Sequence, residues 1–240
     1  MNIVRCGNYD DASRQAYHHL LSRLRDNEKA VLGLPTGSTP LGLYRCMTQG
    51  YVNGDFDYSG ITTFNIDEYA GMERNNPDSY YLFMQRKLFN GINVAEERRH
   101  IPSGLGNLEH NCLEYDRLME AAGGIDILVL AVGANGHIGF NEPGTPFEST
   151  THIIELTGRT RADNARFFKS PEDVPEQALT MGIKLMMNAR EIIFIGTGKE
   201  KADAVRRMVN GPVTTDCPAS VLQLHPNITL YLDSEAAGDL

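Results

Sequence analysis

The stretch from Gly133 to Pro143, GANGHIGFNEP, gathers side chains that could move protons. It holds one imidazole, His137, and one carboxylate, Glu142, together with the amide of Asn135. An imidazole and a carboxylate on one glycine-rich loop can exchange a proton near neutral pH, because histidine titrates in that range. The alternative is a capped turn with a surface histidine, since glycine and asparagine often occur in loops for geometry alone.

Asp67 is a second candidate for acid–base chemistry, in the sequence FNIDEY. It follows the β-rich run Ile61–Ile66, so we expect it at the carboxyl end of a strand. Side chains alternate along a strand, so Glu68 points elsewhere if Asp67 points into a cleft. Asp67 is then a candidate general base. The alternative is a solvated pair of acids that ends the strand.

Phosphate binding is the chemistry indicated by PTGSTP, the residues Pro35–Pro40. They lie between a short apolar run and a helical pattern. In a strand–loop–helix unit of this kind, backbone N–H groups and hydroxyls point at the anion, and the helix dipole favours negative charge. Gly37, Ser38 and Thr39 are the candidate donors. No Gly-Lys-Ser/Thr follows, so this is not a Walker A loop, and an N-cap without a ligand is the alternative.

Basic side chains that could complete an anion site occur in two places. Thr157–Phe168 contains Arg159, Arg161 and Arg166, which indicates a phosphate contact or a mobile cover, with a solvated helix face as the alternative. Near the C-terminal end, a second strand–glycine loop–helix unit places Lys199 at its turn.

These candidate loops need a scaffold, and the apolar runs before them predict buried strands. The clearest is Ile125–Val132, which only Asp126 interrupts and which ends in glycine. Such runs alternate with helical patterns, which predicts an α/β fold with a mostly parallel sheet covered on both faces. Ligand sites of such sheets lie at the carboxyl ends of the strands. We expect one further helix within Pro175–Asn188, and a single domain over residues 1–240.

The bulk composition excludes several classes of protein. With 31 acidic and 22 basic residues the net charge is -9, which argues against a general nucleic-acid or anionic-membrane surface. No signal-peptide pattern or membrane-length apolar run is present, so we expect a cytoplasmic soluble protein. The four cysteines are far apart and form no CxxC pair, which indicates reduced thiols. They are Cys6, Cys46, Cys112 and Cys217.

Several motifs together resemble the glucosamine-6-phosphate deaminases of the amino-sugar isomerase class. They span nearly the whole chain in the order found in that family, and the set is far more specific than any one motif. The resemblance implies a Rossmann-like three-layer αβα sandwich. It also implies conversion of D-glucosamine 6-phosphate and water to D-fructose 6-phosphate and ammonium in amino-sugar catabolism, with no cofactor or metal. The motifs are GLPTGSTP (Gly33–Pro40), FNIDEY (Phe64–Tyr69), GANGHIGFNEP (Gly133–Pro143), TRADNARFF (Thr160–Phe168) and LQLHP (Leu222–Pro226).

The resemblance also implies roles for the acid–base residues. Asp67 would be the base that shifts the proton of carbon 2 to carbon 1 of the open-chain sugar. His137 would move a proton to and from the ring oxygen, and Glu142 would orient that imidazole. Asn135 stands where some members have aspartate, and because an amide cannot ionise, the proton chemistry falls on Glu142 and His137.

By the same resemblance, the phosphate would lie on residues 37–39, with Arg166 and Lys199 completing the charge. Residues 158–175 resemble a mobile lid that would exclude water from the bound substrate. His152 and Ile154 stand where the hexameric members activated by N-acetylglucosamine 6-phosphate have basic residues, and the chain is shorter. We therefore expect no such activation, and a monomer or a small homo-oligomer.

Two other functions stay open. A 6-phosphogluconolactonase of the same fold would share the phosphate loop and a Gly-His loop, but it would not need Asp67 as a base. Its pattern also differs from the FNEP ending found here. A non-catalytic sugar-phosphate-binding domain normally accompanies a DNA-binding segment, and the residues before the first expected strand are too few for a helix-turn-helix.

Overall fold

A seven-stranded sheet forms the centre of the computed structural model, which describes residues 1–165 and 168–240. All the pairings in this sheet are parallel, as the alternating pattern of strands and helices predicts. In spatial order its strands are β1 (Asn2–Cys6), β10 (Ile228–Asp233), β9 (Glu191–Gly196), β6 (Ile127–Leu130), β2 (Val31–Leu34), β3 (Thr62–Asn65) and β5 (Arg99–His100).

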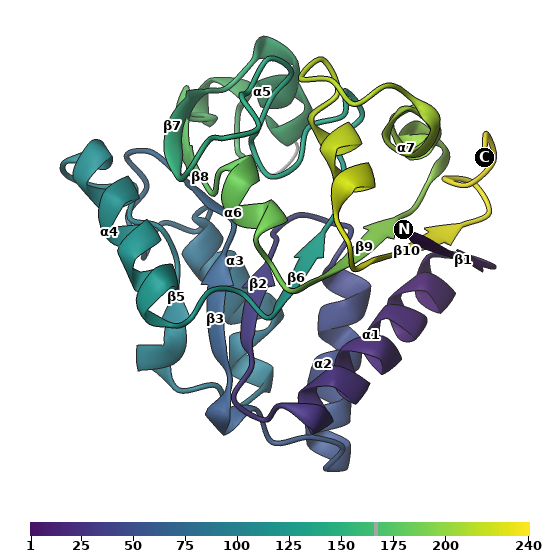
Figure 1. Cartoon of the computed structure of the whole chain (residues 1–240). Helices are drawn as coiled ribbons and strands as arrows, with labels where there is room; N and C mark the ends of the chain where they lie inside the picture. The colour runs from purple at the N-terminus through teal and green to yellow at the C-terminus, as the bar shows by residue number, and fades with distance from the viewer. Residues whose placement is uncertain (166–167) are drawn as a thin grey trace.

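Helices cover both faces of this sheet, which confirms the αβα sandwich (Figure 1). Side chains of β6 alternate between the two layers: Leu128 and Leu130 pack in one core, and Ile127 and Val129 in the other. The second core also contains buried residues of α1, α2 and α3, whereas the first contains those of α4, α6 and α7. The helices are α1 (Tyr9–Asp26), α2 (Leu41–Asn53), α3 (Tyr80–Lys87), α4 (Leu108–Ala121), α5 (Gly158–Asn164), α6 (Ile183–Met187) and α7 (Ala202–Asn210).

A second, three-stranded sheet was not predicted from the sequence. Its order is β4 (Asp67–Tyr69), β8 (Gln177–Thr180) and β7 (His152–Glu155), with antiparallel pairings throughout. Figure 1 places β7, β8 and α5 together at the top of the view. The helix expected within Pro175–Asn188 is confirmed as Ile183–Met187, and the strand β8 precedes it within the same range.

The strand β8 was not predicted because it obtains both of its partners from distant parts of the chain. Gly182 then separates the strand from α6. A Cβ at this glycine would lie 2.1 Å from the carbonyl oxygen of Thr150. In the described ranges, no helix combines the length and the apolar composition that a membrane span needs.

Candidate active site

The loops that follow β2, β3 and β6 surround one cavity of about 340 Å³. Its wall includes Asp67, His137 and the loop residues Gly37, Ser38 and Thr39. Three motifs that are far apart in the sequence therefore meet at the carboxyl edge of the parallel sheet, where open α/β sheets bind ligands.

Asp67 is buried in the wall of this cavity, with 6% of its surface exposed. Its Oδ1 atom has no hydrogen-bond partner among the described residues. Burial, with the neighbouring charge of Glu68, raises the pKa of Asp67 to about 8. A carboxylate that is desolvated and unpaired in this way holds a proton strongly, as a base that attacks a C–H bond must.

Glu68 points away from that cavity, as strand alternation predicts for the residue after Asp67. Its carboxylate accepts hydrogen bonds from the backbone N–H groups of Tyr69, Tyr80 and Tyr81, at 2.9, 3.1 and 3.0 Å. It therefore ties β4 to the first turn of α3.

The imidazole of His137 packs directly over the backbone of Gly133. A Cβ at Gly133 would lie 2.2 Å from Nε2 of this ring, so no larger residue leaves room for the imidazole. The Gly133 N–H also donates to the His137 carbonyl at 2.9 Å, which closes the loop. The sequence GANGH thus brings the ring to the end of β6, in the cavity wall.

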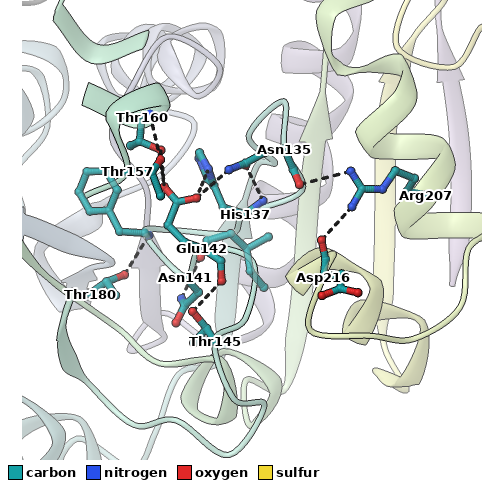
Figure 2. A network of polar contacts seen from close by, with 12 residues as sticks. Asn135, His137, Asn141, Glu142, Thr145, Thr157, Thr160, Thr180, Arg207 and Asp216 are labelled. Carbon is teal, nitrogen blue, oxygen red and sulfur yellow. Dashed lines mark hydrogen bonds and ion pairs between the residues drawn. The ribbon is translucent and has the colours of Figure 1, made fainter. Parts of the chain in front are cut away.

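Glu142 and Asn135 lie behind His137 and hold it in place (Figure 2). The Nδ1 atom of His137 is 3.8 Å from Oε2 of Glu142, which is an ion-pair distance rather than a hydrogen bond. Asn135 donates from Nδ2 to Glu142 at 2.7 Å and accepts the His137 backbone N–H at 3.1 Å. The amide therefore orients both groups without ionising.

Two hydroxyl groups from the start of α5 complete the environment of Glu142 (Figure 2). Thr160 and Thr157 both donate to Oε1, the second of them at 3.4 Å. Burial alone would raise the pKa of Glu142, but His137 and the hydroxyl and amide donors outweigh it and hold the pKa below its ordinary value. Glu142 is thus an ionised partner for the imidazole.

The structure brings Lys201, and not Lys199, to the cavity wall. Gly198 has a φ of +88°, and the short helix Lys199–Lys201 follows it, leaving Lys199 exposed. The role of Lys199 in the anion site therefore stays a prediction, and Lys201 is the lysine of this turn that borders the cavity. The turn holds two lysines, and the sequence does not show which of them faces the cavity.

Of the three predicted arginines, Arg161 is the one whose side chain the structure describes. Arg166 lies outside the described residues. Arg161 turns away, with Nη1 at 3.5 Å from Glu176 and Nη2 donating to the Val174 carbonyl at 3.2 Å. The sequence analysis missed two exposed cations at the end of α3, Arg86 and Lys87, which also border the cavity.

An aromatic cluster forms one side of the cavity, and α5 packs against it. The ring centroid of Tyr69 lies 4.8 Å from that of Tyr80 and 5.4 Å from that of Phe168. Asn164 of α5 donates to the Tyr69 hydroxyl at 3.0 Å. Since Thr160, Asn164 and Phe168 all line the cavity, part of the predicted lid lies over the candidate site.

Within residues 1–165 and 168–240, no three His, Cys, Asp or Glu side chains are placed so that they could hold a metal ion together.

The fold and the cavity define the class of protein. It is an α/β protein in which Asp67 and His137 lie beside a glycine-containing loop of the kind that binds anions. The chain belongs to the family of glucosamine-6-phosphate isomerases and 6-phosphogluconolactonases, whose family model matches residues 8–230.

Within that family the chain is similar to curated glucosamine-6-phosphate deaminases. It is 47% identical to the enzyme of Alkaliphilus metalliredigens, with 99% of this chain and 98% of the relative covered. It is 44% identical to that of Thermoanaerobacter pseudethanolicus, with 99% and 94% covered.

Solved structures separate the two halves of the family. A monomeric glucosamine-6-phosphate deaminase superimposes with a TM-score of 0.98 at 41% identity, and all of both chains is covered. A 6-phosphogluconolactonase from Trypanosoma brucei gives a TM-score of 0.79 at 16% identity, with 100% of this chain and 98% of the other covered. The second likeness is one of fold alone.

Proposed function

We propose that this protein is a glucosamine-6-phosphate deaminase, which converts D-glucosamine 6-phosphate and water to D-fructose 6-phosphate and ammonium. The observation that carries the proposal is the position of Asp67 and His137 in one cavity beside the loop of residues 37–39. The two curated relatives and the monomeric neighbour, which bear this activity in their names, support it.

Binding of the phosphate is the first step. Gly37, Ser38 and Thr39 supply N–H groups and hydroxyls, and Lys201 supplies a positive charge from the next loop of the cavity wall. A charge-assisted hydrogen bond contributes about 1.5–3 kcal/mol, so a few such contacts hold a dianion despite the net charge of -9.

Opening of the sugar ring is the second step: the bond between carbon 1 and the ring oxygen breaks, the hydroxyl of carbon 1 loses its proton and becomes the carbonyl, and the ring oxygen needs a proton. His137 delivers it, and the ionised carboxylate of Glu142 stabilises the imidazolium form at an Nδ1–Oε2 distance of 3.8 Å. Asn135 holds His137 and Glu142 in position through one hydrogen bond to each residue.

Isomerisation is the third step. In the open-chain sugar, Asp67 takes the proton from carbon 2, the electrons of the broken C–H bond form the double bond between carbons 1 and 2, and the π electrons of the carbon 1 carbonyl move to its oxygen, which takes a proton from the ammonium group of the substrate. The proton held by Asp67 then returns to carbon 1 while the lone pair of the nitrogen forms the double bond to carbon 2. The ketimine that results reacts with water to give the ketose and ammonium. Asp67 must be ionised to accept the proton, so turnover is expected to rise with pH through its pKa of about 8.

An ammonia assay tests the proposal directly. Glucosamine 6-phosphate should release ammonia and form fructose 6-phosphate in equal amounts, whereas N-acetylglucosamine 6-phosphate should release none. Acid release from 6-phosphogluconolactone without ammonia release would instead identify a lactonase. Binding of the amino-sugar phosphate without turnover would identify a non-catalytic domain.

We further propose that the enzyme is a cytoplasmic monomer that N-acetylglucosamine 6-phosphate does not activate. All four cysteines are free, which fits a reducing compartment. The solved neighbour described as monomeric is covered over its full length. Light scattering coupled to gel filtration should give a mass near 26.6 kDa. A mass of six such chains would contradict this part of the proposal.

A further inference from the structure

Two adjacent carboxylates of β4, Asp67 and Glu68, are both buried but have opposite environments. Their exposed fractions are 6% and 3%. Glu68 accepts three backbone N–H groups, whereas Oδ1 of Asp67 has no partner among the described residues. The family motif explains Asp67, but nothing in the reaction described above uses Glu68.

The three N–H donors provide a reason for Glu68 to stay ionised inside the protein. Two of them, from Tyr80 and Tyr81, belong to the first turn of α3, where the helix dipole also favours negative charge. Burial raises the pKa of Glu68, and these hydrogen bonds oppose that rise. Burial outweighs the bonds and leaves the pKa of Glu68 at about 7, so Glu68 is ionised in the more alkaline range where Asp67 titrates, and a negative charge then lies one residue away from the candidate base.

The other ionisable groups around the pair are few. On the cavity side, His137 and Lys201 line the same wall as Asp67, with Asp78, Arg86 and Lys87 along α3 and its N-terminal approach. On the far side, Glu68 borders a second cavity of about 410 Å³. The charged residues that share the wall of this second cavity are Glu73 and Arg74, and Tyr81 is also part of it.

Among the charged groups around Asp67, Glu68 is the neighbour whose field raises its pKa. It reaches Asp67 through the low-dielectric strand rather than through solvent, so water screens the interaction little. The tyrosines whose phenol groups interact with the charge of Asp67 are all neutral, because burial raises their pKa; they are Tyr44, Tyr69, Tyr80 and Tyr115.

We propose that Glu68 is a positioning residue that acts through Asp67: its buried negative charge sets how tightly Asp67 holds the proton taken from carbon 2, while its hydrogen bonds fix the start of α3. The second effect places Tyr80 in the cavity wall. This inference rests on the proposed function, because it requires Asp67 to be the base.

The test is the pH profile of kcat/KM for Glu68→Gln. Removing the charge should move the midpoint of the acid limb of this profile to lower pH by about one unit. This is the lower end of the range of pKa shifts that a close charge produces. The substrate titrates identically with every variant, so a difference between variants reports the enzyme. An unchanged midpoint would overturn the inference.

Glu73→Gln is the matched control for the charge. It removes one carboxylate from an exposed position in the wall of the second cavity, and its acid limb should coincide with that of the wild type. An equal shift in this variant would mean that net charge, not Glu68, sets the midpoint. Glu68→Asp retains the charge and should keep the wild-type midpoint, even where its shorter side chain loosens α3.

A reciprocal measurement keeps the inference testable if Glu68→Gln does not fold. Coupling between two charges acts equally in both directions. In Asp67→Asn, the carboxyl carbon of Glu68, followed by selective ¹³C labelling and NMR, should therefore titrate at lower pH than in the wild type. Titration at the same pH in both proteins would contradict the coupling.

Failure of the inference and failure of the proposed function give different results. If Asp67→Asn still releases ammonia at the wild-type rate, Asp67 is not the base and the proposed mechanism fails. If Asp67→Asn is inactive but the midpoint of Glu68→Gln does not move, the role of Glu68 alone is wrong.

Discussion

Two groups of ionisable side chains, each with a buried carboxylate, lie at opposite ends of the parallel sheet. At the carboxyl end, the cavity contains Asp67 and His137, and one polar atom of each lacks a hydrogen-bond partner among the described residues. At the amino end lies Glu191, the first residue of β9, with three side chains that are joined to it directly or through one another by polar contacts. We call these four residues the Glu191 cluster: Glu191, His19, Arg23 and Tyr231.

In the Glu191 cluster each of the four side chains has a hydrogen-bond partner. Glu191 meets Nε2 of His19 at 2.9 Å and accepts from Nε of Arg23 at 2.8 Å. The other imidazole nitrogen of His19 is 3.0 Å from the Tyr231 hydroxyl. The cluster therefore joins α1 to β9 and β10.

The difference shows that residue type alone does not distinguish a candidate catalytic site from a stabilising cluster in this protein. Both sites contain a buried carboxylate and a histidine, and only the supply of partners differs. An unpaired buried polar group costs about 1–3 kcal/mol, so a fold keeps one where another benefit offsets it. Of these two sites, the one at the carboxyl end holds the unpaired atoms. The buried hydroxyls of Ser13, Tyr17 and Tyr58 also lack partners among the described residues and lie outside the cavity wall, so an unpaired atom marks a reacting site only together with the cavity.

The largest expected effect comes from Asp67→Asn. Turnover should fall on the order of 100- to 10,000-fold because the amide cannot accept the proton, while binding of a non-reactive sugar phosphate should persist. Ammonia release under saturating substrate, with calorimetric titration of the analogue, measures both. Turnover at the wild-type level would remove the contrast between the two sites.

A smaller effect is expected from Lys201→Met, and Lys199→Met provides a matched control two residues away. The first variant should raise KM by roughly 10- to 100-fold, the loss of one charge-assisted hydrogen bond to the phosphate. The second should leave KM unchanged, because Lys199 is exposed outside the cavity wall. If steady-state kinetics show that Lys199→Met raises KM and Lys201→Met does not, the phosphate contact belongs to Lys199.

Glu191→Gln should lower stability without lowering turnover. Removing the charge leaves His19 and Arg23 with a weaker partner, and we expect a loss of about 1–3 kcal/mol in the free energy of unfolding. Urea titration measures the loss, and the ammonia assay provides the control. A fall in kcat at a pH and temperature where the variant is fully folded would show that the cluster contributes to the chemistry.

Asp67→Asn should also gain stability in a manner that depends on pH. Because the folded-state pKa of Asp67 is raised to about 8, the wild type loses stability as the pH rises from about 4 through that value. The amide has no such loss. A rise of about four pKa units corresponds to roughly 5 kcal/mol, so the melting temperature of the variant should exceed that of the wild type by roughly 10 °C or more at pH 9 and match it near pH 4. Equal melting temperatures at both pH values would contradict the raised pKa.

Most of the main sheet could be predicted because each of its strands has a recognisable local sequence pattern. Ile125–Val132 and the other apolar runs are recognisable without their partners, and glycine loops follow them at the carboxyl edge. The cavity at residues 37–39, 67 and 137 follows from that order alone. By contrast, β8 depends on pairing with two distant strands, and its four residues carry no helical or alternating pattern that distinguishes them.

By itself, the sequence determined the parallel sheet, the family and the three motifs that meet at its edge, because each of these is encoded in short, contiguous patterns. Tertiary structure decided the rest: Lys201 rather than Lys199 in the cavity wall, the threonines on Glu142, and the three N–H groups on Glu68. Such contacts join residues through space, and the direction of a side chain at a turn depends on how the chain returns to it.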